Sequence, residues 1–202
     1  MDREAILDEF RAAGAYLEGH FILSSGRHSP VYLQCARVLM DPRRAARLCA
    51  ALADRLRAAG LAEGIELVVS PAMGGVIVGY EMGRQLGVPA IFAERVEGRL
   101  MLRRGFAINP AQRILMVEDV VTTGLSSRET LDLIRAHGGE PVAAAALVDR
   151  SGGRADLGVP FVALLEIDAP SFAPEEVPEW LARIPAEKPG SRHLAAKAAG
   201  GG

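Results

Sequence analysis

Lysine is almost absent from this chain of 202 residues, and its two lysines, Lys188 and Lys197, both lie near the C-terminus. All the other basic residues are arginines. A guanidinium group stays protonated and binds phosphate or carboxylate in a bidentate fork, whereas an ammonium group is a compact point charge. The sequence therefore predicts that any cationic chemistry in the body of the protein is arginine chemistry.

Cysteines and long apolar runs are also scarce. Cys35 and Cys49 are the only cysteines, which is too few for a disulfide framework or a cysteine-based metal site. No stretch reaches the roughly 18 uncharged apolar residues that a membrane-spanning helix needs. The first residues are charged and do not have the pattern of a secretory signal. These absences predict a cytoplasmic protein with reduced, buried cysteines and no membrane partner.

The charge is nearly balanced, with 23 Lys and Arg residues against 25 Asp and Glu residues. Proteins that bind nucleic acids usually carry a basic face, so we expect no nucleic-acid partner. Half of the residues are hydrophobic, and this length fits one globular domain. We expect a single domain over residues 1–190, in which an N-terminal part of about residues 1–40 forms one unit with a C-terminal segment. A disordered Gly- and Ala-rich tail should follow over residues 191–202.

Apolar runs without polar alternation alternate with helix-like segments along the chain, which is typical of a parallel sheet covered by helices on both faces. The predicted strands are residues 66–70, 89–93, 114–117, 142–148 and 161–165, and the predicted helices are residues 42–60, 76–86 and 126–137. We expect residues 20–39 to be β-like and residues 94–106 to form a loop. Such sheets bind ligands at the carboxyl ends of their strands. The loops after residues 70, 93, 117 and 149 are therefore the places to search for a site.

The segment after residue 117 carries the most informative pattern, Glu118-Asp119-Val120-Val121-Thr122-Thr123-Gly124-Leu125-Ser126-Ser127. Free N–H groups at the start of a helix, with hydroxyl side chains beside them, form a cradle for phosphate. The acidic pair would repel a phosphate. It suits the hydroxyl groups of a sugar, or a metal ion, bound next to that phosphate. The pattern therefore predicts a sugar-phosphate site. The alternative is an ordinary capped helix, because Ser126 and Glu129 have the spacing of a capping box.

The apolar strand, the acidic pair and the Thr-Thr-Gly loop resemble the signature of the type I phosphoribosyltransferases, whose substrate is phosphoribosyl pyrophosphate (PRPP). The resemblance implies an α/β fold with a central, mostly parallel sheet flanked by helices, a small N-terminal hood and a mobile catalytic loop. It implies that Glu118 and Asp119 bind the ribose hydroxyls. The PRPP-binding residues that it implies are Met73, Gly74, Glu118, Asp119, Val120, Val121, Thr122, Thr123, Gly124, Leu125, Ser126 and Ser127.

Further segments narrow the resemblance to the orotate phosphoribosyltransferase family, which makes orotidine 5'-monophosphate and pyrophosphate from orotate and PRPP. Residues 17–30 resemble its hood, residues 70–75 its pyrophosphate loop and residues 92–106 its mobile loop. Val148-Asp149-Arg150 resembles the strand end whose arginine binds orotate. The resemblance implies orotate contacts from Thr122 and Arg150, and catalytic roles for Asp119, Arg95, Arg99 and Arg103.

The same resemblance implies Mg²⁺ as the cofactor, carried by PRPP near Glu118 and Asp119 without direct protein ligands. It also implies a homodimer in which the mobile loop acts across the interface. The chain departs from the common pattern where many members carry lysines, because Ser24 and Gly74 stand at two of these positions. At Gly74 only the backbone remains to approach the pyrophosphate.

Two other functions are compatible with the acidic-pair loop. One is a related enzyme acting on a purine or on uracil, although no aromatic residue of the kind that purine enzymes often use stands near residues 148–150. The other is a PRPP-sensing regulator that binds RNA or DNA. The acidic balance and the many arginines of residues 95–104 favour the enzyme over the regulator.

Overall fold

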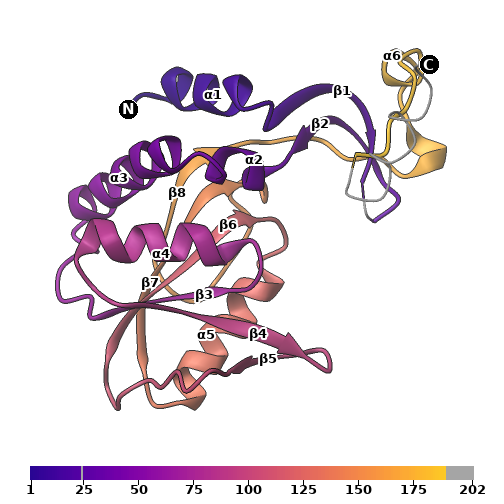
Figure 1. The fold of residues 1–202 in the computed structure, drawn as a ribbon. Helices are drawn as coiled ribbons and strands as arrows, with labels where there is room; N and C mark the ends of the chain where they lie inside the picture. Colours follow the sequence, from indigo (N-terminus) through magenta and orange to yellow (C-terminus); the bar gives the residue numbers. More distant parts are fainter. Residues whose placement is uncertain (24, 190–202) are drawn as a thin grey trace, which may run out of the picture.

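A six-stranded sheet forms the centre of the protein, which we describe from a computed structural model covering residues 1–23 and 25–189 (Figure 1). Ser24 and the predicted tail over residues 191–202 lie outside the described residues. The strands follow the order β5-β4-β3-β6-β7-β8, and only β5 runs antiparallel to its neighbour. They are β3 (Leu67–Pro71), β4 (Ala90–Val96), β5 (Arg99–Leu102), β6 (Arg113–Val121), β7 (Glu140–Asp149) and β8 (Phe161–Glu166). The predicted, mostly parallel α/β sheet is confirmed.

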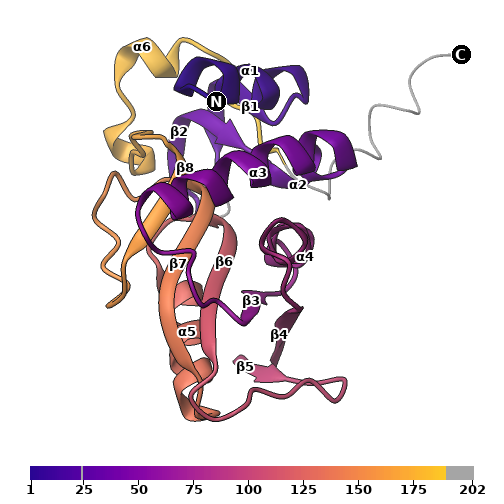
Figure 2. The same ribbon diagram turned by 90° about the vertical axis from the view of Figure 1, so that its left-hand side faces the viewer.

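Helices cover both faces of this sheet, which is why its inner strands are apolar on both sides (Figure 2). Helices α3 (Pro42–Ala58) and α4 (Gly75–Leu86) lie on one face, and α5 (Leu125–Ala136) lies on the other. Successive strand residues point to opposite faces. In β6, Leu115 and Val117 join the core of α3 and α4, whereas Met116 joins the core of α5.

Two helices near the N-terminus add side chains to the core on the α3 and α4 side of the sheet. Ile6 and Phe10 of α1 (Arg3–Ala12) are fully buried, as are residues of α3 against which they pack. The prediction that residues 20–39 are β-like is wrong at its end, because α2 spans Cys35–Leu39. Cys35, Val38 and Leu39 have the i, i+3, i+4 spacing of a helix and are buried by it. Among the described residues, no helix combines the length and the apolar character needed to cross a membrane.

The N-terminal and C-terminal parts of the chain meet in a small sheet above the carboxyl edge of the central sheet (Figure 1). Strands β1 (Tyr16–Ile22) and β2 (His28–Leu33) pair antiparallel. The C-terminal segment, with the 3-10 helix η1 (Pro174–Glu176) and α6 (Glu179–Ala182), flanks this pair on both sides. Phe172 and His28 exchange two backbone hydrogen bonds of 2.8 Å, and Ile22 N–H donates to the Glu187 carbonyl at 2.8 Å. We call β1, β2 and residues 169–189 the hood.

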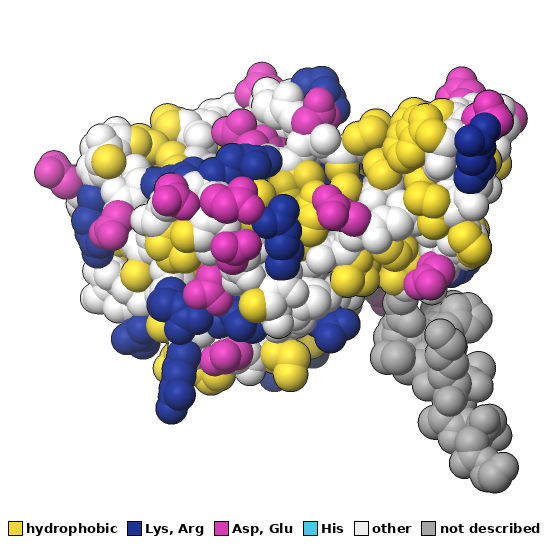
Figure 3. Space-filling model, turned by 90° about the horizontal axis from the view of Figure 1, so that it is seen from above, with side chains coloured by type: hydrophobic (Ala, Val, Ile, Leu, Met, Phe, Trp, Pro, Cys, Tyr) yellow, Lys and Arg dark blue, Asp and Glu magenta, His cyan; other side chains and the backbone are white. Residues whose placement is uncertain are grey.

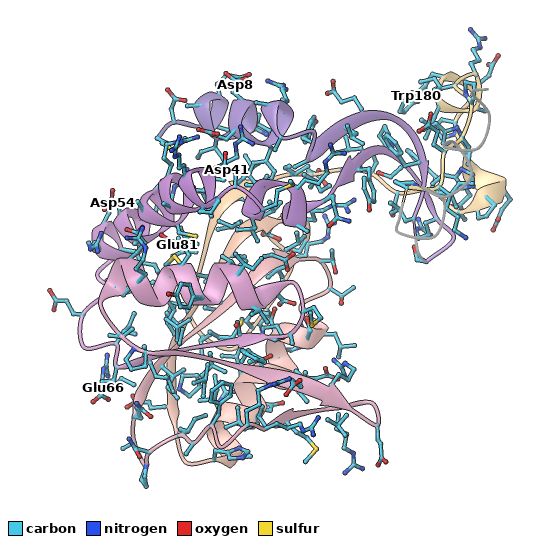
Figure 4. All side chains as sticks on the ribbon, viewed as in Figure 1. Asp8, Asp41, Asp54, Glu66, Glu81 and Trp180 are labelled. Atoms are coloured by element: carbon cyan, nitrogen blue, oxygen red, sulfur yellow. The ribbon has the colours of Figure 1, made fainter. Side chains whose placement is uncertain are left out.

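The surface differs between the hood and the helical layer. Seen from above, acidic and basic side chains intermingle over the helices, whereas hydrophobic side chains gather over the hood (Figure 3). Trp180 of α6 lies at the far end of the hood, is 54% exposed and meets Phe172 edge to face (Figure 4). On the opposite side, Glu81 of α4 is buried next to α3 and accepts hydrogen bonds from Arg84 and Gln85.

Helix α4 lies unusually close to the sheet because three glycines, Gly75, Gly79 and Gly83, form its inner face. A Cβ atom built at Gly79 would lie 2.5 Å from Ser70 Oγ and 2.9 Å from Ser70 Cβ. No side chain larger than hydrogen fits there without displacing β3 or α4. This close approach fixes the N-terminus of α4 beside the carboxyl end of β6.

Residues 94–106 contain a β-hairpin, so the prediction of a loop over this range is wrong for most of it. Strands β4 and β5 pair from Ala93 opposite Leu102 to Val96 opposite Arg99. The turn between them is Glu97-Gly98, in which both residues have positive φ angles, 49° and 83°. A two-residue turn of this kind matches the twist of an antiparallel pair. The charged residues of this segment obscured its alternating pattern.

Candidate active site

The carboxyl ends of β6, β7 and β8 meet the hood around a cavity of about 820 Å³. Thr122 and Thr123 follow β6, Arg150 follows β7 and Asp168 follows β8. The hood closes the other side with residues that include Arg27 and Tyr32. This position agrees with the rule that open α/β sheets bind ligands beyond the carboxyl ends of their strands.

Arg150 is the cation of this cavity whose Nε–H group is buried without an acceptor. No hydrogen bond between described residues involves its side chain, and its Nε atom is buried without a partner. Burial lowers the pKa of the Arg150 guanidinium, because taking a charge out of water disfavours the charged form. A buried guanidinium donor without an acceptor is costly unless a ligand supplies one. The cavity is therefore suited to a ligand with a carboxylate or a comparable anionic group.

The loop between β6 and α5 borders the cavity with Thr122 and Thr123. Gly124 adopts a left-handed conformation, with φ at 73°, and α5 begins at the next residue. The first N–H groups of a helix have no partner within it, and of these only Leu125 N–H has a side-chain acceptor among the described residues, Thr123 Oγ1 at 3.4 Å. The predicted capping box is wrong: Ser126 donates its hydroxyl to Glu118, and Glu129 pairs with Arg95 instead. The loop has the free donors that a phosphate cradle requires.

The two acidic residues at the end of β6 point to opposite faces of the sheet. Glu118 lies on the α5 side, where its two carboxylate oxygens accept hydrogen bonds from the hydroxyls of Ser126 and Ser127. Asp119 lies on the α4 side, beside the backbone of Gly74. Glu118 is only 8% exposed, whereas Asp119 is partly exposed.

Burial raises the pKa of both carboxyl groups above their ordinary values. For Glu118, the hydrogen bonds from the two serines act against this effect. For Asp119, backbone N–H donors act against it. Among the described residues, no three His, Cys, Asp or Glu side chains gather as a metal-binding group.

The loop after β3 lies directly beside Asp119. A Cβ atom at Gly74 would be 2.6 Å from Asp119 Oδ1, so the carboxylate occupies the space that a side chain at position 74 would need. Met73 is 85% exposed. The backbone of this loop, rather than a side chain of residue 74, faces whatever binds next to Asp119.

Comparison with known proteins identifies the family. The family model of the phosphoribosyl transferase domain matches residues 39–182. A protein of Sphingopyxis alaskensis named orotate phosphoribosyltransferase is 64% identical over 197 residues, which cover 97% of this chain and 100% of that protein. A relative of the same name from Erythrobacter litoralis is 63% identical over 192 residues, or 95% of this chain and 99% of that protein. The chain belongs to the orotate phosphoribosyltransferase family. The resemblance seen in the sequence is thereby confirmed.

Solved structures of the orotate phosphoribosyltransferase family have the same fold. The enzyme of Aeropyrum pernix is 28% identical, with a TM-score of 0.62 over 80% of this chain and 93% of that chain. The Mycobacterium tuberculosis enzyme, solved with inorganic phosphate, has a TM-score of 0.63 over 81% of this chain and 95% of that chain. At 22% identity, the second likeness shows the fold alone.

The arginines predicted to act in a mobile loop, Arg95, Arg99 and Arg103, lie within the β4–β5 hairpin or directly after it, and none of them lines the cavity. Arg95 pairs with Glu129 of α5. Arg104 pairs with Glu94 through Nε at 3.0 Å and Nη2 at 2.9 Å. Arg99 and Arg103 are exposed, and neither pairs with an acidic side chain of the described residues. These two are the hairpin arginines whose charge is not already matched.

Sequence reasoning missed three charged residues of the cavity, Arg27, Arg154 and Asp168. Asp168 could have been found, because it follows the predicted strand of residues 161–165, whose carboxyl end lies at the same edge of the sheet. Arg154 reaches the cavity because Gly152 and Gly153 both have positive φ angles and turn the chain back. Arg27 donates to Ser171 Oγ at 2.9 Å, a contact between the two ends of the chain that no local pattern reveals.

Proposed function

We propose that this protein transfers the 5-phosphoribosyl group of PRPP to N1 of orotate, releasing pyrophosphate and forming orotidine 5'-monophosphate. The supporting observation is the unpaired guanidinium of Arg150 in a cavity that also contains the end of the phosphate-type loop. Orotate differs from uracil by one carboxylate, and Arg150 is the cation that would bind it. Thr122, which lines the same cavity, would contact the base.

The loop after β6 would bind the rest of the phosphoribosyl group. Free N–H groups over residues 122–127 suit the 5-phosphate. Asp119 is partly exposed and is the acidic residue that we propose for the ribose hydroxyls. The sequence assigns Glu118 to the ribose as well, but both of its oxygens already accept hydrogen bonds from serines.

The pyrophosphate would lie against the backbone of Met73 and Gly74, with cations from the hairpin arginines Arg95, Arg99 and Arg103. Mg²⁺ in proteins is usually held by one or two carboxylates together with substrate phosphates and water. Asp119, beside the pyrophosphate loop, fits that requirement and would be the nearest carboxylate to an ion brought by PRPP. When bound, Mg²⁺ would neutralise charge on the departing pyrophosphate.

Each element then has a task in the reaction. Arg150 would orient orotate, the loop would hold the phosphate, and the arginines would stabilise the leaving group as its charge develops. The hood would exclude water, which otherwise hydrolyses PRPP. We further propose that the protein acts in the cytoplasm as a homodimer, with the hairpin of one subunit reaching the site of the other.

The test is an ultraviolet assay that follows the loss of orotate absorbance with PRPP and Mg²⁺. We expect fast turnover of orotate, at most slow turnover of uracil, no turnover of adenine or hypoxanthine, and no activity in Asp119→Asn. Turnover of another base would keep the PRPP site and refute the role of Arg150. Binding of PRPP without turnover of any base would favour a PRPP sensor.

A further inference from the structure

The loop after β6 is packed against the loop after β7, and the contact lies at Gly124. We call residues 122–127 the phosphate loop and residues 150–158 the orotate loop, after the groups that we propose for them. Gly124 is buried, and its φ angle is 73°. A Cβ atom built there would lie 2.8 Å from Leu157 Cδ2 and 3.5 Å from Ala155 Cβ. The two loops therefore touch with no room for a side chain between them.

Arg128 joins the two loops through its guanidinium group. It is the fourth residue of α5, and its backbone N–H donates to the Gly124 carbonyl at 2.9 Å. The side chain runs back toward the start of the helix, where Nη1 lies 2.9 Å from the Cβ position of Gly124 and donates to the Asp156 carbonyl at 3.2 Å. Among the described residues, this is the only hydrogen bond of the guanidinium. A cation near a helix N-terminus opposes the helix dipole. The position of Arg128 is therefore explained by its bond to the orotate loop and not by the stability of α5.

The orotate loop forms one wall of the cavity, to which Arg150 and Ala155 contribute. At its start, the buried carboxylate of Asp149 accepts the Ser151 N–H at 2.7 Å. Ser151 Oγ in turn accepts the Ala155 N–H at 3.0 Å. These bonds connect the loop from the end of β7 to the segment that meets the phosphate loop. Holding that segment in place therefore also holds the wall of the cavity.

We infer that Arg128 is a positioning residue that holds the orotate loop against the phosphate loop, so that a ligand bound to one loop orders both. The inference rests on the proposed function, because it joins the loop proposed for the 5-phosphate to the loop proposed for orotate. A ligand that orders the first loop lowers the entropy cost of ordering the second, which couples the two sites. Arg128 does not line the cavity, so it acts through the Asp156 carbonyl and not by touching orotate.

Ribose 5-phosphate is the probe for this coupling, because it carries the phosphate and the ribose but has no leaving group with which orotate could react. Amide hydrogen exchange of the full-length protein, with and without ribose 5-phosphate, reports the order of each loop separately. In wild type we expect exchange to slow over residues 122–127 and also over residues 151–158. In Arg128→Met, the slowing should persist over residues 122–127 and be lost over residues 151–158.

Two further variants separate the contact from the charge. Leu157→Val loosens the contact with Gly124 without changing any charge, so it should reduce the slowing over residues 151–158 in the same direction. It gives the answer if Arg128→Met does not fold. Arg135→Met is the matched control, because Arg135 lies at the other end of α5 and pairs with Asp132. This variant should behave as wild type in both loops.

Orotate binding gives a second readout. Ribose 5-phosphate should tighten the binding of orotate about fivefold or more in wild type, the lower end of typical coupling between two sites, and less than about twofold in Arg128→Met. Calorimetric titration of orotate, with and without saturating ribose 5-phosphate, measures this factor. In the full reaction, Arg128→Met should raise the KM for orotate by a similar factor while kcat stays within about twofold of wild type.

The inference is overturned if exchange over residues 151–158 slows equally in wild type and Arg128→Met, or if it does not slow in wild type. A loss of ribose 5-phosphate affinity of about tenfold or more in Arg128→Met, with the coupling intact, would also overturn it, because Arg128 would then bind the phosphate directly. Failure of the proposed function is a separate result: wild type would not convert orotate, while the exchange experiment, which contains no orotate, would still decide the role of Arg128.

Discussion

Replacing Arg150 by methionine should stabilise the free protein and damage the enzyme at the same time. Methionine keeps the length and apolar contacts of the side chain but removes the guanidinium. In the structure, the Nε–H group of Arg150 is buried without an acceptor. An unsatisfied buried donor costs about 1–3 kcal/mol. For a protein of this size, each kcal/mol shifts Tm by about 2–4 °C, so we expect Tm to rise by about 2–12 °C.

The cost to activity follows from the same charge. If Arg150 binds the orotate carboxylate, its removal leaves that carboxylate without its partner, which costs about 2–5 kcal/mol. Since about 1.4 kcal/mol is a factor of ten in rate, kcat/KM for orotate should fall about 30-fold to several thousand-fold. Uracil has no carboxylate, so its low rate should change much less, and the preference for orotate over uracil should collapse.

The assays are thermal unfolding without substrates and initial rates with orotate or uracil at saturating PRPP. Arg154→Met is the matched control, because Arg154 follows in the same turn and lines the same cavity but is exposed. Its Tm should stay close to that of wild type. A folded Arg150→Met protein with an unchanged or lower Tm would refute the unpaired-donor argument. Equal losses with the two bases would refute the assignment of Arg150 to the carboxylate.

Three further outcomes are expected. Gly79→Ala should lower the free energy of unfolding by about 1–3 kcal/mol through overpacking against Ser70, and denaturant unfolding should show part of that loss recovered when Ser70→Gly is added. Burial raises the pKa of Asp119, so the folded state binds this proton more tightly than the unfolded chain and wild-type stability falls as pH rises through the raised pKa. The Tm advantage of Asp119→Asn should therefore be larger at pH about 8 than at pH about 4, and a constant difference would contradict the raised pKa. Arg99→Ala and Arg103→Ala should change the free energy of unfolding by less than about 0.5 kcal/mol. Each should lower kcat/KM for PRPP about tenfold or more. Full activity in both variants would show that neither arginine takes part in catalysis.

The sheet and the phosphate loop could be predicted from the sequence because the information for them is local. The apolar run of residues 114–117 can be buried only with cover on both faces, and that predicts a central parallel strand. The acidic pair followed by Thr122, Thr123 and Gly124 predicts a sugar-phosphate site from chemistry carried by adjacent residues. The predicted capping box of Ser126 and Glu129 is the error within this segment. It does not form because Ser126 donates its hydroxyl to Glu118 and Glu129 pairs with Arg95.

The sequence by itself therefore determined the fold class, the family resemblance and the order of the site segments along the chain. Only the tertiary structure decided which charges share a cavity and which are already paired. Arg95, Arg104 and Arg150 look alike in a sequence, but two of them are matched by glutamates and the Nε–H of the third is buried without a partner. That difference depends on glutamates 10 and 34 positions away and on burial by several elements, and no local pattern records any of these.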